Sequence, residues 1–179
     1  ALQQQVADHF QQKAFAEVKA LLAPQVNNKT KDAFLLAALG RSELALGEVE
    51  QAEKLLARAV KITADNAEYQ FWYGRASCDA AQQASMLSAL GLAKRCAKAF
   101  EAAHQLAPEN AEYLQALAKY YAQAPGVAGG DKAKAMALAA QYPQAWLIGS
   151  DQVAVCKSRL MGKPGTPQAA LAQLQWHRG

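Results

Sequence analysis

The stretch Asn66-Ala67-Glu68-Tyr69-Gln70-Phe71-Trp72-Tyr73-Gly74-Arg75 is repeated in degraded form elsewhere in the chain. Its first four residues return as Asn110-Ala111-Glu112-Tyr113, and its last two match Gly40-Arg41, which lies 34 residues earlier. A fixed period in that range is typical of stacked helix hairpins, because each hairpin needs a neighbour to bury its apolar face. The sequence therefore predicts an all-α stack of antiparallel helix hairpins.

Three units follow this period, and each predicts two helices. The first unit predicts helices over about 32–46 and 49–63. The second begins at Ala67, and an insertion at 82–90 predicts a short helix or an extended loop before its second helix. The third begins at Ala111 and resumes after a glycine-rich turn. Residues 2–23 predict a further hairpin that caps the stack.

The spacing of small and large residues in these units resembles the tetratricopeptide repeat over residues 1–141. The sequence departs from that family at Gln70, where an aromatic residue is usual, and at Ala64, where a closing proline is usual. The resemblance implies a superhelical stack. It also implies a non-catalytic module that binds a protein or peptide in its concave groove.

In such a stack the first helix of each unit lines the concave groove, and the ninth position of each unit commonly points into it. The three cations at this position, with two aromatic residues nearby, are Arg41, Arg75, Lys119, Phe34 and Phe71. These side chains would suit a carboxylate-bearing or extended peptide. The alternative is that each cation pairs internally with an acid of the neighbouring hairpin, such as Glu68 or Glu112.

The distribution of charge argues against two classes of partner. The net charge is +4, and the whole excess of basic residues lies in residues 131–179. A nucleic-acid binder would spread basic residues over a helical face, so we expect no nucleic-acid partner. No apolar run approaches the roughly 18 residues that a membrane span needs, so we expect no membrane partner either.

The cysteine and histidine residues predict no metal site. Cys78, Cys96 and Cys156 form no C-x-x-C pair, and the three histidines are far apart in the sequence. Cys96 occupies a position for a small buried residue, so it is either a buried thiol or the partner of Cys78 in a disulfide of an exported protein. The glycine-rich stretch 124–130 resembles inserts of exported bacterial repeat proteins, which favours the periplasm, with the cytoplasm as the alternative.

From residue 142 the pattern changes from helical to β-prone. Residues 146–155 predict a strand, 162–167 a loop and the residues up to about 175 a helix, which is an α/β-like order. Residues 132–155 (KAKAMALAAQYPQAWLIGSDQVAV) and 160–175 (LMGKPGTPQAALAQLQ) resemble the Maf family of nucleotide pyrophosphatases. We therefore divide the chain into a helical repeat, 1–141, and a partial Maf-like segment, 142–179.

The Maf resemblance implies an alternative function, a nucleoside triphosphate pyrophosphatase of the 7-methyl-GTP type. Asp151 would be the general base or a metal-linked acid, Lys163 a phosphate contact and Gln152 a specificity residue. Mg²⁺ would be needed under this alternative only; the repeat module predicts no cofactor. Residues 1–131 contain no counterpart of the family's phosphate loop, so we expect a hybrid or truncated chain. The apolar strand could also pair with a second copy and form a homodimer.

Overall fold

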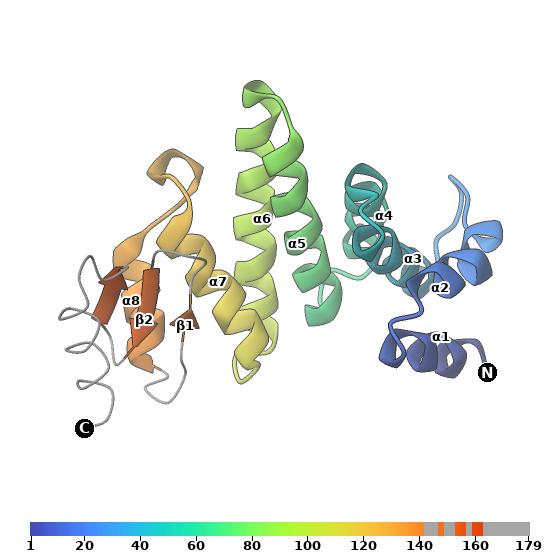
Figure 1. Ribbon diagram of the computed structural model, residues 1–179. Coiled ribbons are helices and arrows are strands. Elements are labelled where there is room, and N and C mark those ends of the chain that lie inside the picture. Colours follow the sequence, from blue (N-terminus) through green and yellow to red (C-terminus); the bar gives the residue numbers. More distant parts are fainter. Residues whose placement is uncertain (142–146, 149–152, 157–158, 163–179) are drawn as a thin grey trace.

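The computed structural model describes residues 1–141 and the backbone of three short strands after them. The helices follow one another as four consecutive pairs, with two 3₁₀ turns between them (Figure 1). The α-helices are α1 (Leu2–Gln11), α2 (Phe15–Leu22), α3 (Ala33–Ala45), α4 (Val49–Ile62), α5 (Ala67–Gln83), α6 (Met86–Leu106), α7 (Ala111–Gln123) and α8 (Lys132–Gln141). The 3₁₀ turns are η1 (Ala23–Gln25) and η2 (Gly126–Ala128). The all-α helical stack expected for residues 1–141 is confirmed.

The strands are β1 (Leu147–Ile148), β2 (Val153–Cys156) and β3 (Arg159–Gly162). They form an antiparallel sheet in the order β1-β2-β3, with Leu147 opposite Val155. Where the sequence predicts one strand over 146–155, the described backbone thus holds two strands paired with each other. Pairing within the chain satisfies backbone groups that a lone strand would leave open. The helix expected up to about 175 lies outside the described residues.

The repeated sequence explains where the first helices begin. Asp32 accepts a hydrogen bond from the Leu35 amide at 3.1 Å, and Asn66 accepts one from the Tyr69 amide at 3.0 Å. Asn110 does the same for Tyr113 at 3.2 Å. Each side chain thereby satisfies an amide that has no partner within the helix. The predicted helix start near residue 32 agrees with these contacts.

The repeated glycines set the distance between the two helices of a hairpin. A Cβ atom added at Gly40 would lie 2.7 Å from Leu56 Cγ, and one added at Gly74 would lie 2.6 Å from Phe100 Cδ1. Real carbon atoms do not approach so closely, so only glycine allows α3 to pack on α4 and α5 to pack on α6 in this way. The apolar core lies between these helices and continues from one hairpin to the next.

The hairpin formed by α5 and α6 is longer than its neighbours. Helices α5 and α6 contain 17 and 21 residues, compared with 13 and 14 in α3 and α4. The sequence predicts a short helix or an extended loop at 82–90, and this prediction is wrong. The insertion instead extends both helices. The hairpin therefore projects beyond the stack (Figure 1). The inserted residues are rich in alanine and leucine, which favour helix continuation.

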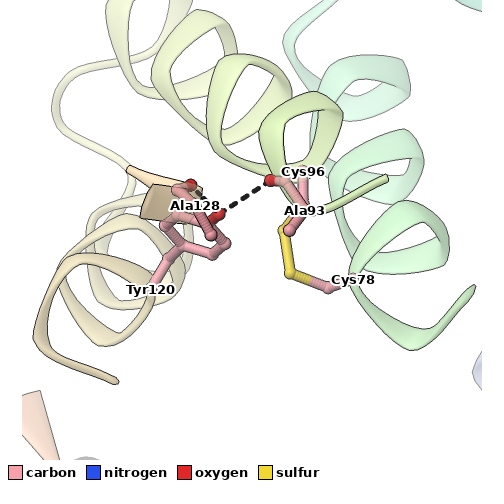
Figure 2. Close-up of a disulfide and its surroundings, with 5 residues drawn as sticks. All are labelled: Cys78, Ala93, Cys96, Tyr120 and Ala128. Carbon is pink, nitrogen blue, oxygen red and sulfur yellow. Dashed lines mark hydrogen bonds between the residues drawn. A yellow bond between two sulfur atoms is a disulfide. The ribbon is translucent and has the colours of Figure 1, made fainter. Parts of the chain in front are cut away.

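A disulfide joins the two helices of the long hairpin. Cys78 on α5 and Cys96 on α6 are bonded, with their Cα atoms 5.2 Å apart (Figure 2). Cys96 is fully buried, as expected for the small-residue position. Of the two alternatives that the sequence leaves open, the bonded pair is the one present.

Tyr120 connects the long hairpin with the last one. Its hydroxyl lies 2.8 Å from the Ala93 carbonyl oxygen on α6 and 2.5 Å from the Ala128 carbonyl oxygen in η2 (Figure 2). A hydroxyl has one proton, so it donates to one of these oxygens at a time. This contact holds the glycine-rich turn against α6, and Asp131 then caps α8 through the Lys134 amide at 3.0 Å.

Candidate functional site

The cations at equivalent repeat positions lie on the first helices of three hairpins. Arg41 is on α3, Arg75 on α5 and Lys119 on α7. The structure does not bring them into one site. It divides them between two cavities, and α5 forms a wall of both. The two predicted aromatic residues are divided in the same way.

The first cavity lies between α1, α3 and α5 and has a volume of about 430 Å³. Its lining includes Phe10, Phe34, Arg41, Glu68 and Trp72. Helix α1 comes from the N-terminal capping hairpin, which is also anchored by the ion pair between Lys19 Nζ and Glu43 Oε2 at 2.9 Å. The capping hairpin therefore contributes one wall of this cavity.

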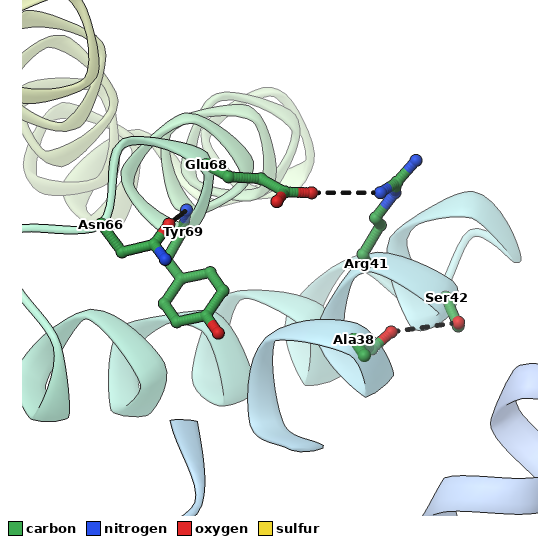
Figure 3. Close-up of polar contacts among 6 residues, drawn as sticks. All are labelled: Ala38, Arg41, Ser42, Asn66, Glu68 and Tyr69. Carbon is green, nitrogen blue, oxygen red and sulfur yellow. Dashed lines mark hydrogen bonds and ion pairs between the residues drawn. The ribbon is translucent and has the colours of Figure 1, made fainter. Parts of the chain in front are cut away.

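Arg41 is engaged by its neighbours within the first cavity. Its guanidinium nitrogen Nη1 lies 3.2 Å from Glu68 Oε1, and Figure 3 shows Glu68 reaching it from the start of α5. Its Cζ atom also lies 4.0 Å from the Phe10 ring centroid and 4.6 Å from the Trp72 ring centroid. Burial lowers the pKa of Arg41 while Glu68 opposes that effect. Three internal contacts thus hold this guanidinium in place.

The second cavity lies between α5, α6 and α7 and is larger, about 640 Å³. Four charged side chains face it: Arg75 and Asp79 from α5, and Glu112 and Lys119 from α7. Arg75, Glu112 and Lys119 are exposed, and none of the four forms an ion pair with a described residue. These charged groups are therefore available to a ligand, which Arg41 is not.

Asp79 is the charged group of the second cavity that sequence reasoning did not identify. Its carboxyl is half-buried, and burial raises its pKa, while the nearby Arg75 and Lys119 act in the opposite direction. The signal for it was its spacing of four residues from Arg75, which places both side chains on one face of a helix. The acids considered from the sequence were those at the start of each unit.

The two aromatic residues predicted for the groove have different surroundings. Phe34 is half-buried and lines the first cavity. Phe71 is only 3 % exposed; its ring centroid lies 4.8 Å from that of Tyr113 and 5.9 Å from that of Phe100. Phe71 is therefore part of the apolar core and contributes only an edge to the second cavity. Trp72, its neighbour, is the ring that contacts the cations Arg41 and Arg75.

A third cavity of about 390 Å³ lies between α6, α7 and α8. Tyr121 donates a hydrogen bond to Glu101 Oε1 at 2.5 Å, and Lys134 Nζ lies 5.3 Å from the Tyr121 ring centroid. Burial and the hydrogen bond to Glu101 raise the pKa of Tyr121 strongly, so the phenol stays protonated at neutral pH. These polar groups contact one another. None of the predicted site residues lines the third cavity.

The predicted catalytic residues Asp151 and Lys163 and the predicted specificity residue Gln152 lie outside the described residues. Within the described part of the chain, no three His, Cys, Asp or Glu side chains converge as a metal site would require. None of the described helices combines the length and the apolar composition of a membrane span.

Comparison with solved structures supports the fold. A thermophilic tetratricopeptide-repeat protein of Thermus thermophilus superposes on the whole of this chain and on 84 % of its own chain, with a TM-score of 0.62 and 20 % sequence identity. The helices of residues 1–141 are thus arranged as in a tetratricopeptide repeat. At this level of identity the likeness concerns the fold alone.

Comparison of sequences leads to the other family. The 7-methyl-GTP pyrophosphatase of Aromatoleum aromaticum is 54 % identical over 46 residues, which are 26 % of this chain and 24 % of that protein. The enzyme of the same name from Pseudomonas aeruginosa is 57 % identical over 42 residues, which are 24 % and 22 % of the two chains. This chain therefore spans about a quarter of the length of these curated relatives. The family model described as Maf-like protein matches residues 82–179, more than half of the chain, and the chain accordingly belongs to the Maf-like family.

Proposed function

We propose that residues 1–141 act as a non-catalytic module that binds a protein or peptide segment along its first helices. The observation that carries this proposal is the second cavity, where Arg75 and Lys119 face an open groove without an ion pair to a described residue. The tetratricopeptide-like fold supports a protein partner in general terms. The charged side chains of the cavity then indicate which chemical groups the ligand carries.

The guanidinium of Arg75 and the ammonium of Lys119 would contact carboxylate groups of that segment. Charge-assisted hydrogen bonds of this kind are roughly twice as strong as neutral ones, and an arginine can bind both carboxylate oxygens at once. Arg41 contributes differently, because Glu68 already occupies one side of its guanidinium and two rings stack on it. We therefore assign Arg41 and Phe34 to the wall of the groove, and Arg75 and Lys119 to ligand contact.

A selection from a random heptapeptide library tests this assignment. The full chain should enrich peptides that contain acidic residues, and a variant with Arg75→Ala and Lys119→Ala should not. The matched control is Lys61→Ala with Lys98→Ala, which removes two exposed cations from α4 and α6, away from the groove. Equal enrichment by the wild type and the groove variant would contradict the proposal.

A second candidate function rests on the family match over residues 82–179. In this candidate Asp151 activates water or holds Mg²⁺, Lys163 neutralises the triphosphate and Gln152 contributes to base specificity. The substrate would be 7-methyl-GTP or a similar nucleotide. The chain spans about a quarter of the length of these curated relatives, so the activity stays a proposal for this chain.

The enzymatic candidate is tested by incubating the full chain at high concentration with 7-methyl-GTP, dTTP or UTP and Mg²⁺. Release of pyrophosphate that disappears in Asp151→Asn would support it. No release from any of the three nucleotides would exclude it, and the peptide-binding proposal would be unaffected.

We further propose that the protein works in an oxidising compartment, with the periplasm as the first choice. The disulfide between Cys78 and Cys96 supports this location, because such bonds rarely persist where glutathione keeps thiols reduced. Labelling with maleimide in cells lysed directly into denaturant, without reductant, should modify only Cys156. Modification of all three cysteines would contradict the proposal.

A homodimer through the C-terminal residues stays a proposal as well. An edge strand of a small sheet presents unpaired backbone groups that a second copy could pair with. Removal of residues 142–179 should then convert a dimer into a monomer. The molecular mass in solution should therefore fall to less than half of that of the full chain. A chain that is monomeric in both forms would end this proposal.

A further inference from the structure

The second cavity holds a carboxylate that the proposed contacts with an acidic ligand do not use. Asp79 lines the cavity from α5 and is half-buried, yet it forms no hydrogen bond or ion pair with a described residue. Burial disfavours the charged form of this carboxylate, and the nearby Arg75 and Lys119 offset only part of that cost because neither forms an ion pair with it. Such a group is a candidate for contact with a cation from a ligand.

The cavity is long enough for several residues of a peptide. Its lining follows α7 from Glu112 to Gln123 and α5 from Phe71 to Gln82, which is twelve residues, or eleven helical steps, along each helix. At about 1.5 Å per helical residue this is about 16 Å, or the length of about five residues of extended chain. A single amino acid would fill only part of that length, so an extended segment is the better fit.

The charged side chains that line the cavity are of both signs. Arg75 and Asp79 are four residues apart on α5, and Glu112 and Lys119 face them from α7. A purely acidic ligand would satisfy the two cations but would approach two carboxylates of its own sign. A segment that carries both signs avoids this repulsion, because its basic group can be placed on the carboxylate.

We propose that the second cavity selects an extended peptide segment that carries a basic side chain on Asp79 and an acidic group between Arg75 and Lys119. This inference rests on the proposed function and adds the selectivity of the same groove. Ala116 and Pro125, which also line the cavity and are not buried, provide apolar surface for the aliphatic part of the ligand's basic side chain. The first cavity offers no such pair, because Glu68 already neutralises Arg41.

The same heptapeptide selection tests the inference when Asp79→Asn is added. The wild type should enrich peptides with lysine or arginine at one position near an acidic residue. Asp79→Asn should keep the acidic preference and lose the basic one. The matched control is Asp65→Asn, the same change at an exposed turn outside the cavity, which should behave as the wild type.

A double-mutant cycle then measures the contact itself. One enriched peptide is compared with its analogue in which the basic residue is glutamine, against the wild type and Asp79→Asn, by fluorescence anisotropy. The basic residue should strengthen binding to the wild type about tenfold, and should change binding to Asp79→Asn less than about twofold. Circular dichroism melting of Asp79→Asn confirms that the variant is folded.

The outcomes separate the two proposals. Enrichment of acidic peptides without a basic preference, or equal effects of the glutamine change on both proteins, would overturn the role of Asp79 and leave the proposed function standing. Failure of the wild type to enrich any peptide would overturn both. If free arginine binds as tightly as the peptide, the claim that the ligand is an extended segment is overturned.

Discussion

The first and second cavities lie along the same row of helices and carry cations at equivalent repeat positions, but those cations have different surroundings. Arg41 is placed between Phe10 and Trp72 and paired with Glu68, so its charge is used to hold α1, α3 and α5 together. Arg75 and Lys119 are exposed and form no ion pair with a described residue. Equivalent positions in a repeat can therefore serve stability in one unit and recognition in the next.

The largest expected difference between the surroundings of the two cavities concerns the disulfide beside the second cavity. Replacing Cys78 and Cys96 with alanine should lower the free energy of unfolding by about 3 kcal/mol, because the bond closes a loop in the unfolded chain. The two cysteines are 18 residues apart, so the effect belongs to the long hairpin. Urea unfolding of the wild type with and without reductant measures it. The variant itself should be insensitive to reductant, and identical curves for the wild type would contradict the prediction.

The next effect distinguishes the cations by their role in binding. Arg75→Ala together with Lys119→Ala should weaken an enriched peptide by about fiftyfold, which corresponds to two charge-assisted contacts of slightly more than about 1 kcal/mol each. Arg41→Ala should change the affinity by less than about threefold, since its guanidinium is already engaged. Fluorescence anisotropy at constant salt gives both values. Similar losses for the two variants would remove the distinction between the cavities.

Arg41 should instead affect stability. Arg41→Ala removes two ring contacts and one ion pair from a side chain that is 29 % exposed, and should cost about 1–3 kcal/mol of unfolding free energy. Arg75→Ala, at the exposed equivalent position, is the matched control and should leave the unfolding curve nearly unchanged. If both variants unfold at the same denaturant concentration, the contacts of Arg41 contribute nothing measurable.

The smallest expected effect is a dependence of peptide binding on pH. Burial raises the pKa of Asp79, so its carboxyl gains a proton at a higher pH than an exposed aspartate would. The affinity for a peptide with a basic residue should therefore be lower at an acidic pH than at neutral pH, because the protonated carboxyl no longer attracts the basic group. The other charged groups that face the cavity are Arg75, Lys119 and Glu112.

Two control variants assign the pH effect. Asp79→Asn should remove most of the dependence, and Glu112→Gln should retain it. The glutamine analogue of the peptide should bind the wild type almost equally at both pH values. A pH dependence that persists in Asp79→Asn would place its origin in another group.

The repeat itself was largely predictable. Helices expected over 32–46 and 49–63 are observed at Ala33–Ala45 and Val49–Ile62, because the period of apolar residues and the capping side chains are local signals. The form of the insertion at 82–90 was not predictable in the same way. Helix-forming residues such as alanine and leucine are compatible with a separate short helix or with longer helices, and the packing of α5 against α6 decided between them.

The candidate site was predicted only in part. The sequence placed Arg41, Arg75 and Lys119 on equivalent first-helix positions, and the structure has them there. It left open whether each cation contacts a ligand or an internal acid, and the surroundings of Arg41 differ from those of the other two. Asp151 and Lys163 lie outside the described residues, so their roles stay predictions from the family resemblance.

Spacing along the chain was enough to predict the hairpins of residues 1–141, the helix starts and the likeness of the C-terminal residues to the Maf family. Three features became visible only in the folded chain: Cys78 bonds Cys96, Phe71 lies in the core and Asp79 faces a cavity. A helical period specifies only which face of its helix a residue occupies. What meets that face depends on the neighbouring hairpin, whose position is set by packing between residues far apart in the sequence.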